Sequence, residues 1–152
     1  LSDIVDRLLD LRMYYDEYRP ILLKVSPDLS HEQLDEIIDY CLRSGIDGIV
    51  AGNTTRSRDG ITSISKEKIE EIGNGGMSGA PVHKKNLELV RYVHTKSEGK
   101  LPIIGVGGIM SPEQAKDMLN AGASLVEIYS GFIYEGPSLV KRILKYLEQT
   151  VK

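Results

Sequence analysis

The sequence predicts an α/β protein built from four parallel strands, each followed by a helix. Four short apolar runs, at residues 21–25, 46–51, 103–106 and 125–129, alternate with stretches whose apolar residues recur at helical spacing. Strands that alternate with helices favour a parallel sheet with helices packed on it. Each run is followed by a polar or glycine-rich segment, as expected where the strands of such a sheet carry functional groups at their carboxyl ends.

The chain begins with a predicted helix from Ser2 to about Tyr18, which Pro20 ends. Its apolar residues are Ile4, Val5, Leu8, Leu9, Met13 and Tyr15. The first strand follows at 21–25. Ser30 then caps a second helix, with Gln33 completing a capping box and Gly45 at its end. The apolar stripe of this helix is formed by Leu34, Ile37, Ile38, Cys41 and Leu42. We expect Cys41 to be a core residue and not a reactive thiol.

The second strand, 46–51, leads into a long polar and glycine-rich stretch from 52 to about 81. Loops of this length are uncommon unless they are functional or disordered, and we expect part of this one to form short antiparallel strands or a lid. A helix over 86–95 follows, with Leu87, Val90 and Val93 on one face.

The third strand, 103–106, runs into a turn that contains Gly105, Gly107 and Gly108. Ser111 caps the next helix, over 112–121, and Gln114 is expected to complete its capping box. A strand, a glycine turn and a helix N-terminus together form a candidate anion site. The turn is not the dinucleotide fingerprint, because Met110 stands where the third glycine belongs.

The last strand, 125–129, precedes a final helix that begins at Gly136-Pro137. Its expected inward-facing residues are Leu139, Val140, Ile143, Leu144 and Leu147.

Composition excludes several classes of protein. The 152 residues suggest one domain, 41% are hydrophobic, and the net charge of −3 provides no basic field for nucleic acid. No apolar run approaches the roughly 20 residues that span a bilayer. The single cysteine excludes an internal disulfide. His31, His83 and His94 show no metal-ligand spacing, so we expect no metal site.

The four strand ends are expected to meet in one pocket, where Lys24, Asn53, Thr54 and Ser130 would lie together. A lysine there can pair with a phosphate, or with an electron-rich ring whose negative charge grows on reduction. The alternative is that Lys24 pairs with Asp28 or Asp47. Asp28 is expected to be a loop or cap residue and not a general base.

Five stretches carry a resemblance to a known family. They are Lys24-Val25-Ser26-Pro27-Asp28-Leu29, Asn53-Thr54-Thr55-x-Ser57-Arg58, Gly75-Gly76-Met77-Ser78-Gly79-Ala80-Pro81, Gly105-Val106-Gly107-Gly108-Ile109, and Ile128-Tyr129-Ser130-Gly131-Phe132-Ile133-Tyr134-x-Gly136-Pro137. In order and spacing the sequence resembles dihydroorotate dehydrogenase of class 2, the quinone-linked type. The resemblance covers essentially the whole chain.

The resemblance implies that residues 1–152 are the C-terminal half, strands five to eight, of an FMN-binding (β/α)8 TIM barrel. Such an enzyme oxidises dihydroorotate to orotate in de novo pyrimidine biosynthesis and passes the electrons to a quinone. Lys24 would contact the flavin ring, and Asn53 and Thr54 would hydrogen-bond orotate. The residues implied along the flavin or its phosphate are Gly79, Gly108, Tyr129 and Ser130. Gly52 replaces the usual threonine of the family, so only a main-chain contact to the flavin would survive there.

The resemblance also implies what this chain lacks. The first four strands, the loop with the catalytic serine base and the N-terminal helices that form the quinone tunnel would lie upstream. We therefore expect the chain alone to be inactive, and the half-barrel to self-associate through exposed edges. The parent protein would lie peripherally on the cytoplasmic side of a membrane.

Two other interpretations remain open on the residues alone. One is a stand-alone phosphate-binding α/β module without catalysis. Such a closed module should have polar edge strands, whereas Ile21-Leu22-Leu23 and Ile103-Ile104 are expected to be fully buried. The other is half of a different flavin- or nucleotide-binding barrel, which the matches at 53–55 and 75–81 disfavour.

Overall fold

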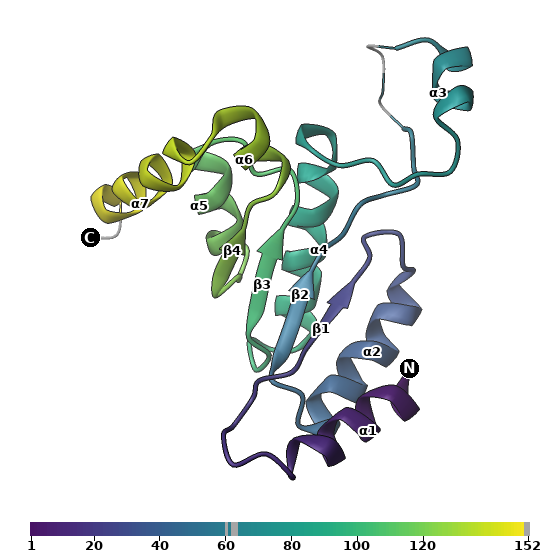
Figure 1. Cartoon of the computed structure of the whole chain (residues 1–152), viewed down its shortest axis with the longest axis vertical. Coiled ribbons are helices and arrows are strands. Elements are labelled where there is room, and N and C mark those ends of the chain that lie inside the picture. The colour runs from purple at the N-terminus through teal and green to yellow at the C-terminus, as the bar shows by residue number, and fades with distance from the viewer. Residues whose placement is uncertain (60, 62–63, 151–152) are drawn as a thin grey trace.

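Four parallel strands pair in the order in which they occur in the chain. The computed structural model describes residues 1–59, 61 and 64–150. The sheet has the order β1-β2-β3-β4, with β1 at Leu22–Val25, β2 at Gly48–Ala51, β3 at Ile103–Val106 and β4 at Leu125–Glu127. Each connection therefore steps to the next strand in the same direction. Because such crossovers share one hand, their helices cover the same face of the sheet (Figure 1).

Five of the described α-helices were predicted from the sequence, and α3 and α6 were not. Their bounds are α1 Ser2–Arg12, α2 His31–Ser44, α3 Lys66–Ile72, the 3-10 turn η1 Ala80–Val82, α4 His83–Lys96, α5 Pro112–Asn120, α6 Ser130–Glu135 and α7 Ser138–Thr150. The helix α4 packs on β2 and β3, and α5 lies between β4 and α7. The short helix α3 lies on an excursion that projects from the rest of the molecule (Figure 1).

The two faces of the sheet are very different. Ile49 of β2 is paired in register with Ile103 of β3, and both side chains are completely buried beneath the helices. The intervening residues point to the other face, where Val50 is in register with Ile104, and Ile104 with Leu125. On this second face Val50 and Ile104 are only half-buried, and Leu125 is 62% exposed. Within residues 1–59, 61 and 64–150, this second, largely apolar face of the sheet is therefore uncovered.

The capping signals behave as expected at the second helix. Ser30 Oγ accepts a hydrogen bond from the Gln33 N–H, and Gln33 Oε1 accepts one from the Ser30 N–H. Gly45 has φ +79° and ends the helix in the left-handed region. Cys41 is buried in the core, and burial raises the pKa of its thiol to about 11, so it is a packing residue as predicted.

The expected capping box at Ser111 is only half formed. The Ser111 hydroxyl accepts from the Gln114 N–H, but the Gln114 carboxamide oxygen accepts from the N–H of Met110, 2.8 Å away. Gln114 thus ties down the end of the glycine turn and not the cap itself.

The first helix is shorter than the sequence predicts, ending at Arg12 and not near Tyr18. Arg12 directs its guanidinium to Asp47, at 2.7 Å, and the Tyr18 hydroxyl donates to the same carboxylate. Asp47 also accepts from the backbone N–H of Ile21. This cluster favours an irregular connection into β1 over a further helical turn.

The stretch from 52 to 81 contains a helix that the sequence did not reveal. The expected antiparallel pairing is reduced to one bridge between Thr55 and Met77, and α3 occupies the middle. Positions 60, 62 and 63 of this stretch lie outside the described residues. At the other end of the chain, β4 stops at Glu127, and α6 occupies part of what was expected to be a connection.

Several apolar residues expected in the core are exposed. Leu42 is 40% exposed, Val140 39% and Leu144 56%, although Leu139 and Ile143 of the same final helix are buried. The run Ile21–Leu23 was expected to be fully buried but is half-buried, because β1 is an edge strand next to the uncovered face. Ile103 is buried as expected, whereas Ile104 is not fully so.

The uncovered sheet face predicts that the isolated chain self-associates, because exposed apolar strands and free strand edges pair readily. Light scattering on purified chain should show dimers or larger species. Leu125→Asp, which places a charge on that face, should shift the population toward monomer. Met13→Asp is the matched control, because Met13 is 82% exposed and precedes β1. A monodisperse wild-type monomer would contradict this expectation.

Candidate functional site

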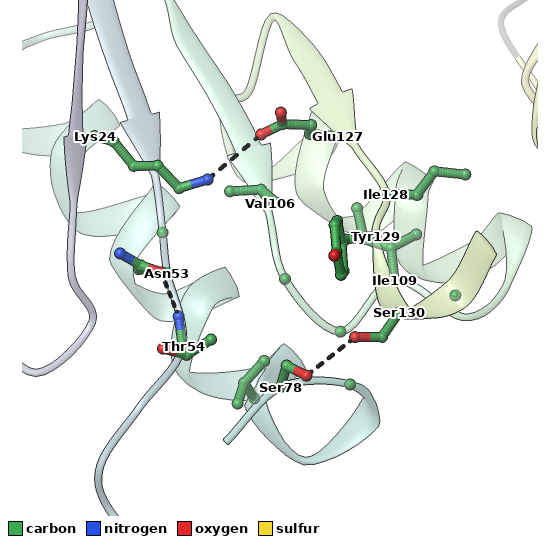
Figure 2. A pocket seen from close by; sticks show the side chains of 16 residues that line it. Lys24, Asn53, Thr54, Ser78, Val106, Ile109, Glu127, Ile128, Tyr129 and Ser130 are labelled. Atoms are coloured by element: carbon green, nitrogen blue, oxygen red, sulfur yellow. Dashed lines mark hydrogen bonds and ion pairs between the residues drawn. The ribbon is translucent and has the colours of Figure 1, made fainter. Parts of the chain in front are cut away.

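The carboxyl ends of all four strands surround one cavity of about 270 Å³. This is close to the lower end of the roughly 300–1,000 Å³ typical of small-molecule sites. In Figure 2, Asn53 and Thr54 lie on one side of the cavity, and Tyr129 and Ile128 lie on the other. Lys24 and Glu127 stand at one end, and Ser78 and Ser130 at the opposite end. Segments more than 100 residues apart in the sequence thus meet at one place.

All eight residues singled out from the sequence line this cavity. They are Lys24, Gly52, Asn53, Thr54, Gly79, Gly108, Tyr129 and Ser130. The long 52–81 stretch contributes through Gly79, at which a Cβ would lie 3.8 Å from the Cβ of Ser130. The structure therefore brings the predicted residues together around one cavity.

The turn after β3 presses directly against the start of α4. Gly107 and Gly108 have φ values of +115° and +70°, which side chains rarely adopt. A Cβ on Gly108 would overlap the backbone of His83, and one on Gly107 would overlap the carboxamide of Asn86. These two glycines let the turn pack closely against α4, and both of them line the cavity.

Asn86 is the buried polar residue behind this wall. Its side chain is completely buried, and its Nδ2 donates to the carbonyl oxygen of Asn53 at 3.1 Å. A Cβ on Gly52 would overlap the Asn86 carboxamide, which gives a physical reason for glycine at position 52. Sequence reasoning missed this residue, because a lone asparagine in a helix gives no signal of its own.

A second polar cluster ties the loops after β1 and β2 to α4. Asp28 accepts hydrogen bonds from the Lys85 ammonium, the Thr55 hydroxyl and the Arg56 N–H. Partial burial raises the pKa of Asp28, but these three donors outweigh it and lower the pKa to about 2. A carboxylate with so low a pKa accepts a proton only weakly. Asp28 is therefore a structural residue that links the two loops, and not a general base, as expected from its place in the sequence.

Lys24 does not pair with Asp28 or Asp47, the partners considered for it. Asp47 binds Arg12, and Lys24 instead forms an ion pair with Glu127, 3.8 Å away across the cavity (Figure 2). The lysine therefore does face the cavity, together with a carboxylate that the sequence analysis did not single out.

The lining combines an apolar wall with polar ends. Val82, Val106, Ile109 and Ile128 supply the wall. The Thr54 N–H donates to Asn53 Oδ1 at 2.8 Å, which orients that carboxamide, and Ser130 donates to Ser78 Oγ at 3.2 Å. A flat ligand with polar edges and an anionic group suits such a site.

Ser78, Val106 and Glu127 are the most informative lining residues that sequence reasoning missed. Val106 and Glu127 are in register on β3 and β4. Glu127 is two residues after Leu125 on the same strand, so alternation of side chains along the strand would have placed it on the same, uncovered face. Ser78 lies in the glycine-rich stretch, where no periodicity exists to place it.

A second hollow lies directly beside the first and shares Ser78, Gly79, Tyr129 and Ser130 with it. Ile133 and Tyr134 of α6 line its far side and are 72% and 78% exposed. The hollow thus connects the site to an exposed, largely apolar surface.

The described part of the chain holds neither a metal-binding cluster nor a membrane-spanning helix. Among the described residues, no three His, Cys, Asp or Glu side chains are grouped to hold a metal ion. None of the helices in that part of the chain is long and apolar enough to cross a membrane.

The packing of Asn86 against Gly52 predicts that the two positions are energetically coupled. Gly52→Ala should lower the free energy of unfolding by about 1–3 kcal/mol, as overpacking does, because the new methyl group overlaps the carboxamide. In an Asn86→Ser background the same change should cost less than half as much. Urea unfolding of the four proteins measures this coupling.

The control for this experiment is Gly75→Ala, where an added Cβ meets nothing within 4 Å. That substitution should change stability by no more than about 0.5 kcal/mol. Equal penalties for Gly52→Ala in both backgrounds would show that Asn86 does not determine the choice of glycine.

Comparisons with known proteins agree on one family. The family model described as dihydroorotate dehydrogenase matches residues 4–151. The chain is 42% identical over 147 residues to the dihydroorotate dehydrogenase (quinone) of Proteus mirabilis, covering 97% of this chain and 43% of that protein. It is 46% identical over 143 residues to that of Christiangramia forsetii, covering 94% and 41%.

Solved structures give the same result. A ligand-free crystal structure of the DHODH of Eimeria tenella superposes with a TM-score of 0.76 at 35% identity, covering 85% of this chain and 35% of that one. The complex of that protein with ferulenol gives 0.78 at 32% identity, covering 88% and 35%. The chain thus spans less than half the length of the relatives it matches.

Proposed function

The chain belongs to the dihydroorotate dehydrogenase family, and on that premise we propose that it is the flavin- and orotate-binding part of a quinone-linked enzyme. The reaction is the oxidation of dihydroorotate to orotate in de novo pyrimidine biosynthesis. The observation that carries the proposal is that all eight residues implied by the family resemblance line one cavity at the strand ends. Residues 1–152 would supply strands five to eight of a (β/α)8 barrel.

The cavity suits FMN in three respects. Two glycines of the turn after β3, Gly107 and Gly108, line it, its wall is apolar, and Lys24 places an ammonium at one end. Lys24 would lie beside the flavin ring, with Gly52 contacting the cofactor through its main chain. The residues proposed along the ring or the phosphate are Gly79, Gly108, Tyr129 and Ser130. When bound, FMN supplies the capacity to accept two electrons.

Asn53 and Thr54 are proposed to hold the substrate. Both side chains are exposed to the cavity, and the hydrogen bond from the Thr54 N–H orients the Asn53 carboxamide. Amide and hydroxyl groups can donate to the carboxylate and ring oxygens of orotate, and they add no charge of their own. The bond from Asn86 to the Asn53 carbonyl keeps this strand end in place.

The proton acceptor is proposed to lie outside this chain. The serines of the cavity, Ser78 and Ser130, hydrogen-bond to each other, Asp28 is too weak a base, and the Glu127 carboxylate is paired with the Lys24 ammonium. Oxidation of dihydroorotate to orotate removes one hydride and one proton, and a base must take the proton. We therefore propose that a serine on the other half of the barrel takes it, and that this chain alone does not turn over.

The electron acceptor is proposed to be a quinone, as in the names of the relatives from Proteus mirabilis and Christiangramia forsetii. Its main binding region would be the N-terminal part of the parent protein, which would lie peripherally on the cytoplasmic side of a membrane. The exposed apolar hollow beside the flavin cavity leaves a path by which an apolar acceptor can approach. A stand-alone phosphate-binding module is less well supported, because its apolar sheet face would remain open to water.

A hybrid enzyme tests the proposal. The matched part of the Proteus mirabilis protein is replaced by this chain, and the hybrid is purified and supplied with FMN. We expect one FMN per chain, oxidation of dihydroorotate with a quinone acceptor, and no turnover by the 152-residue chain alone. In the hybrid, Asn53→Ala should retain FMN and lose about tenfold to a hundredfold in kcat/KM, the value of one or two hydrogen bonds to a charged group.

A folded hybrid that binds no FMN would refute the proposal. Turnover by the chain alone, free of any other half, would refute the assignment of the proton acceptor to a missing segment.

A further inference from the structure

One carboxylate in the cavity has no part in the proposed function. Glu127 is the last residue of β4, and its Oε2 lies 3.8 Å from the ammonium nitrogen of Lys24 on β1 (Figure 2). These strands are the two outer members of the sheet. Among the cavity-lining residues, all of which are described, Lys24 and Glu127 are the two that carry charge.

Strand register explains why the two charges face each other. Glu127 is in register with Val106, two residues beyond Ile104 on β3. Lys24 is in register with Val50, whose partner on β3 is Ile104. Residues in register point to the same face of a sheet, and residues two apart on a strand do so as well. Both charged side chains therefore rise from the uncovered face into the same cavity.

The pair is not built to stabilise the fold. The side chains are 48% and 53% exposed, and such exposed ion pairs contribute little to stability. By contrast, the Lys85–Asp28 pair behind the cavity is at 2.5 Å and is fixed by further hydrogen bonds. The effect of Glu127 is therefore expected on whatever occupies the cavity, where exclusion of water strengthens every charge interaction.

We propose that Glu127 lowers the midpoint potential of flavin bound in this cavity by offsetting the charge of Lys24, an inference that rests on the proposed function. Dihydroorotate gives up a hydride, which is two electrons and a proton, to the flavin, and a second proton to a base. A hydride accepted by a flavin in this cavity would thus add one negative charge beside Lys24. The Lys24 ammonium favours this charge, and the Glu127 carboxylate beside it opposes it, so Glu127 is a positioning and tuning residue for Lys24.

The test uses Glu127→Gln, which removes the charge and keeps the shape. The full 152-residue chain and the variant are titrated with oxidised FMN and, without oxygen, with chemically reduced FMN. We expect the ratio of the two dissociation constants to shift about tenfold in favour of reduced FMN in the variant. For a two-electron couple this is a rise of about 30 mV in midpoint potential.

The matched control is Glu98→Gln, which removes the carboxylate of another exposed lysine pair, Lys100–Glu98 at 2.6 Å. This pair lies before the amino end of β3, whereas the cavity lies at the carboxyl ends of the strands. Its loss should leave the ratio of the two dissociation constants unchanged. Thermal unfolding should be the same for all three proteins, because neither pair stabilises the fold appreciably.

The outcomes separate the two proposals. FMN binding with an unchanged ratio in Glu127→Gln, or an equal shift in Glu98→Gln, overturns the role of Glu127 and leaves flavin binding intact. Failure of both the wild-type chain and the Glu127→Gln variant to bind either form of FMN overturns this inference and flavin binding together.

Discussion

The structure depends on one constraint: all four strands run in the same direction and pair in chain order. Parallel pairing places the carboxyl ends of the four strands on one side of the molecule. Residues as far apart in the sequence as Lys24 and Tyr129 therefore line the same cavity. Pairing in chain order places the helices on one face only, so Val50, Ile104 and Leu125 lie on a face with no cover. The same arrangement therefore creates the site and leaves one face of the sheet exposed.

Polar ties, one of them buried, hold the strand ends in position behind the cavity. Asn86 joins α4 to the backbone of Asn53, and its carboxamide fills the space beside Gly52 and Gly107. Lys85, one residue earlier, binds Asp28 and so fastens the loop after β1 to the same helix. A helix that reaches both loops sets the distance between them. The shape of the cavity thus depends on α4 as much as on the residues that line it.

Much of this could be predicted from the sequence where a local rule applies. Apolar runs marked the strands, Ser30 with Gln33 marked a helix start, and the position of strand ends placed Lys24, Asn53, Gly108 and Ser130 at one edge. Local rules failed where long-range contacts decide. The first helix ends at Arg12, whose side chain binds Asp47, and Gln114 bonds to Met110 in place of closing its cap. Glu127 was missed because its importance depends on Lys24, about 100 residues away.

The position of bound FMN tests most directly whether the strand ends form a flavin site. Backbone amide NMR of the labelled chain during titration with FMN would locate the contact. We expect the largest shifts at Gly79, Gly108 and Ser130. Shifts confined to the separate hollow lined by Arg56, Arg58 and Asn74, with none at the strand ends, would contradict it.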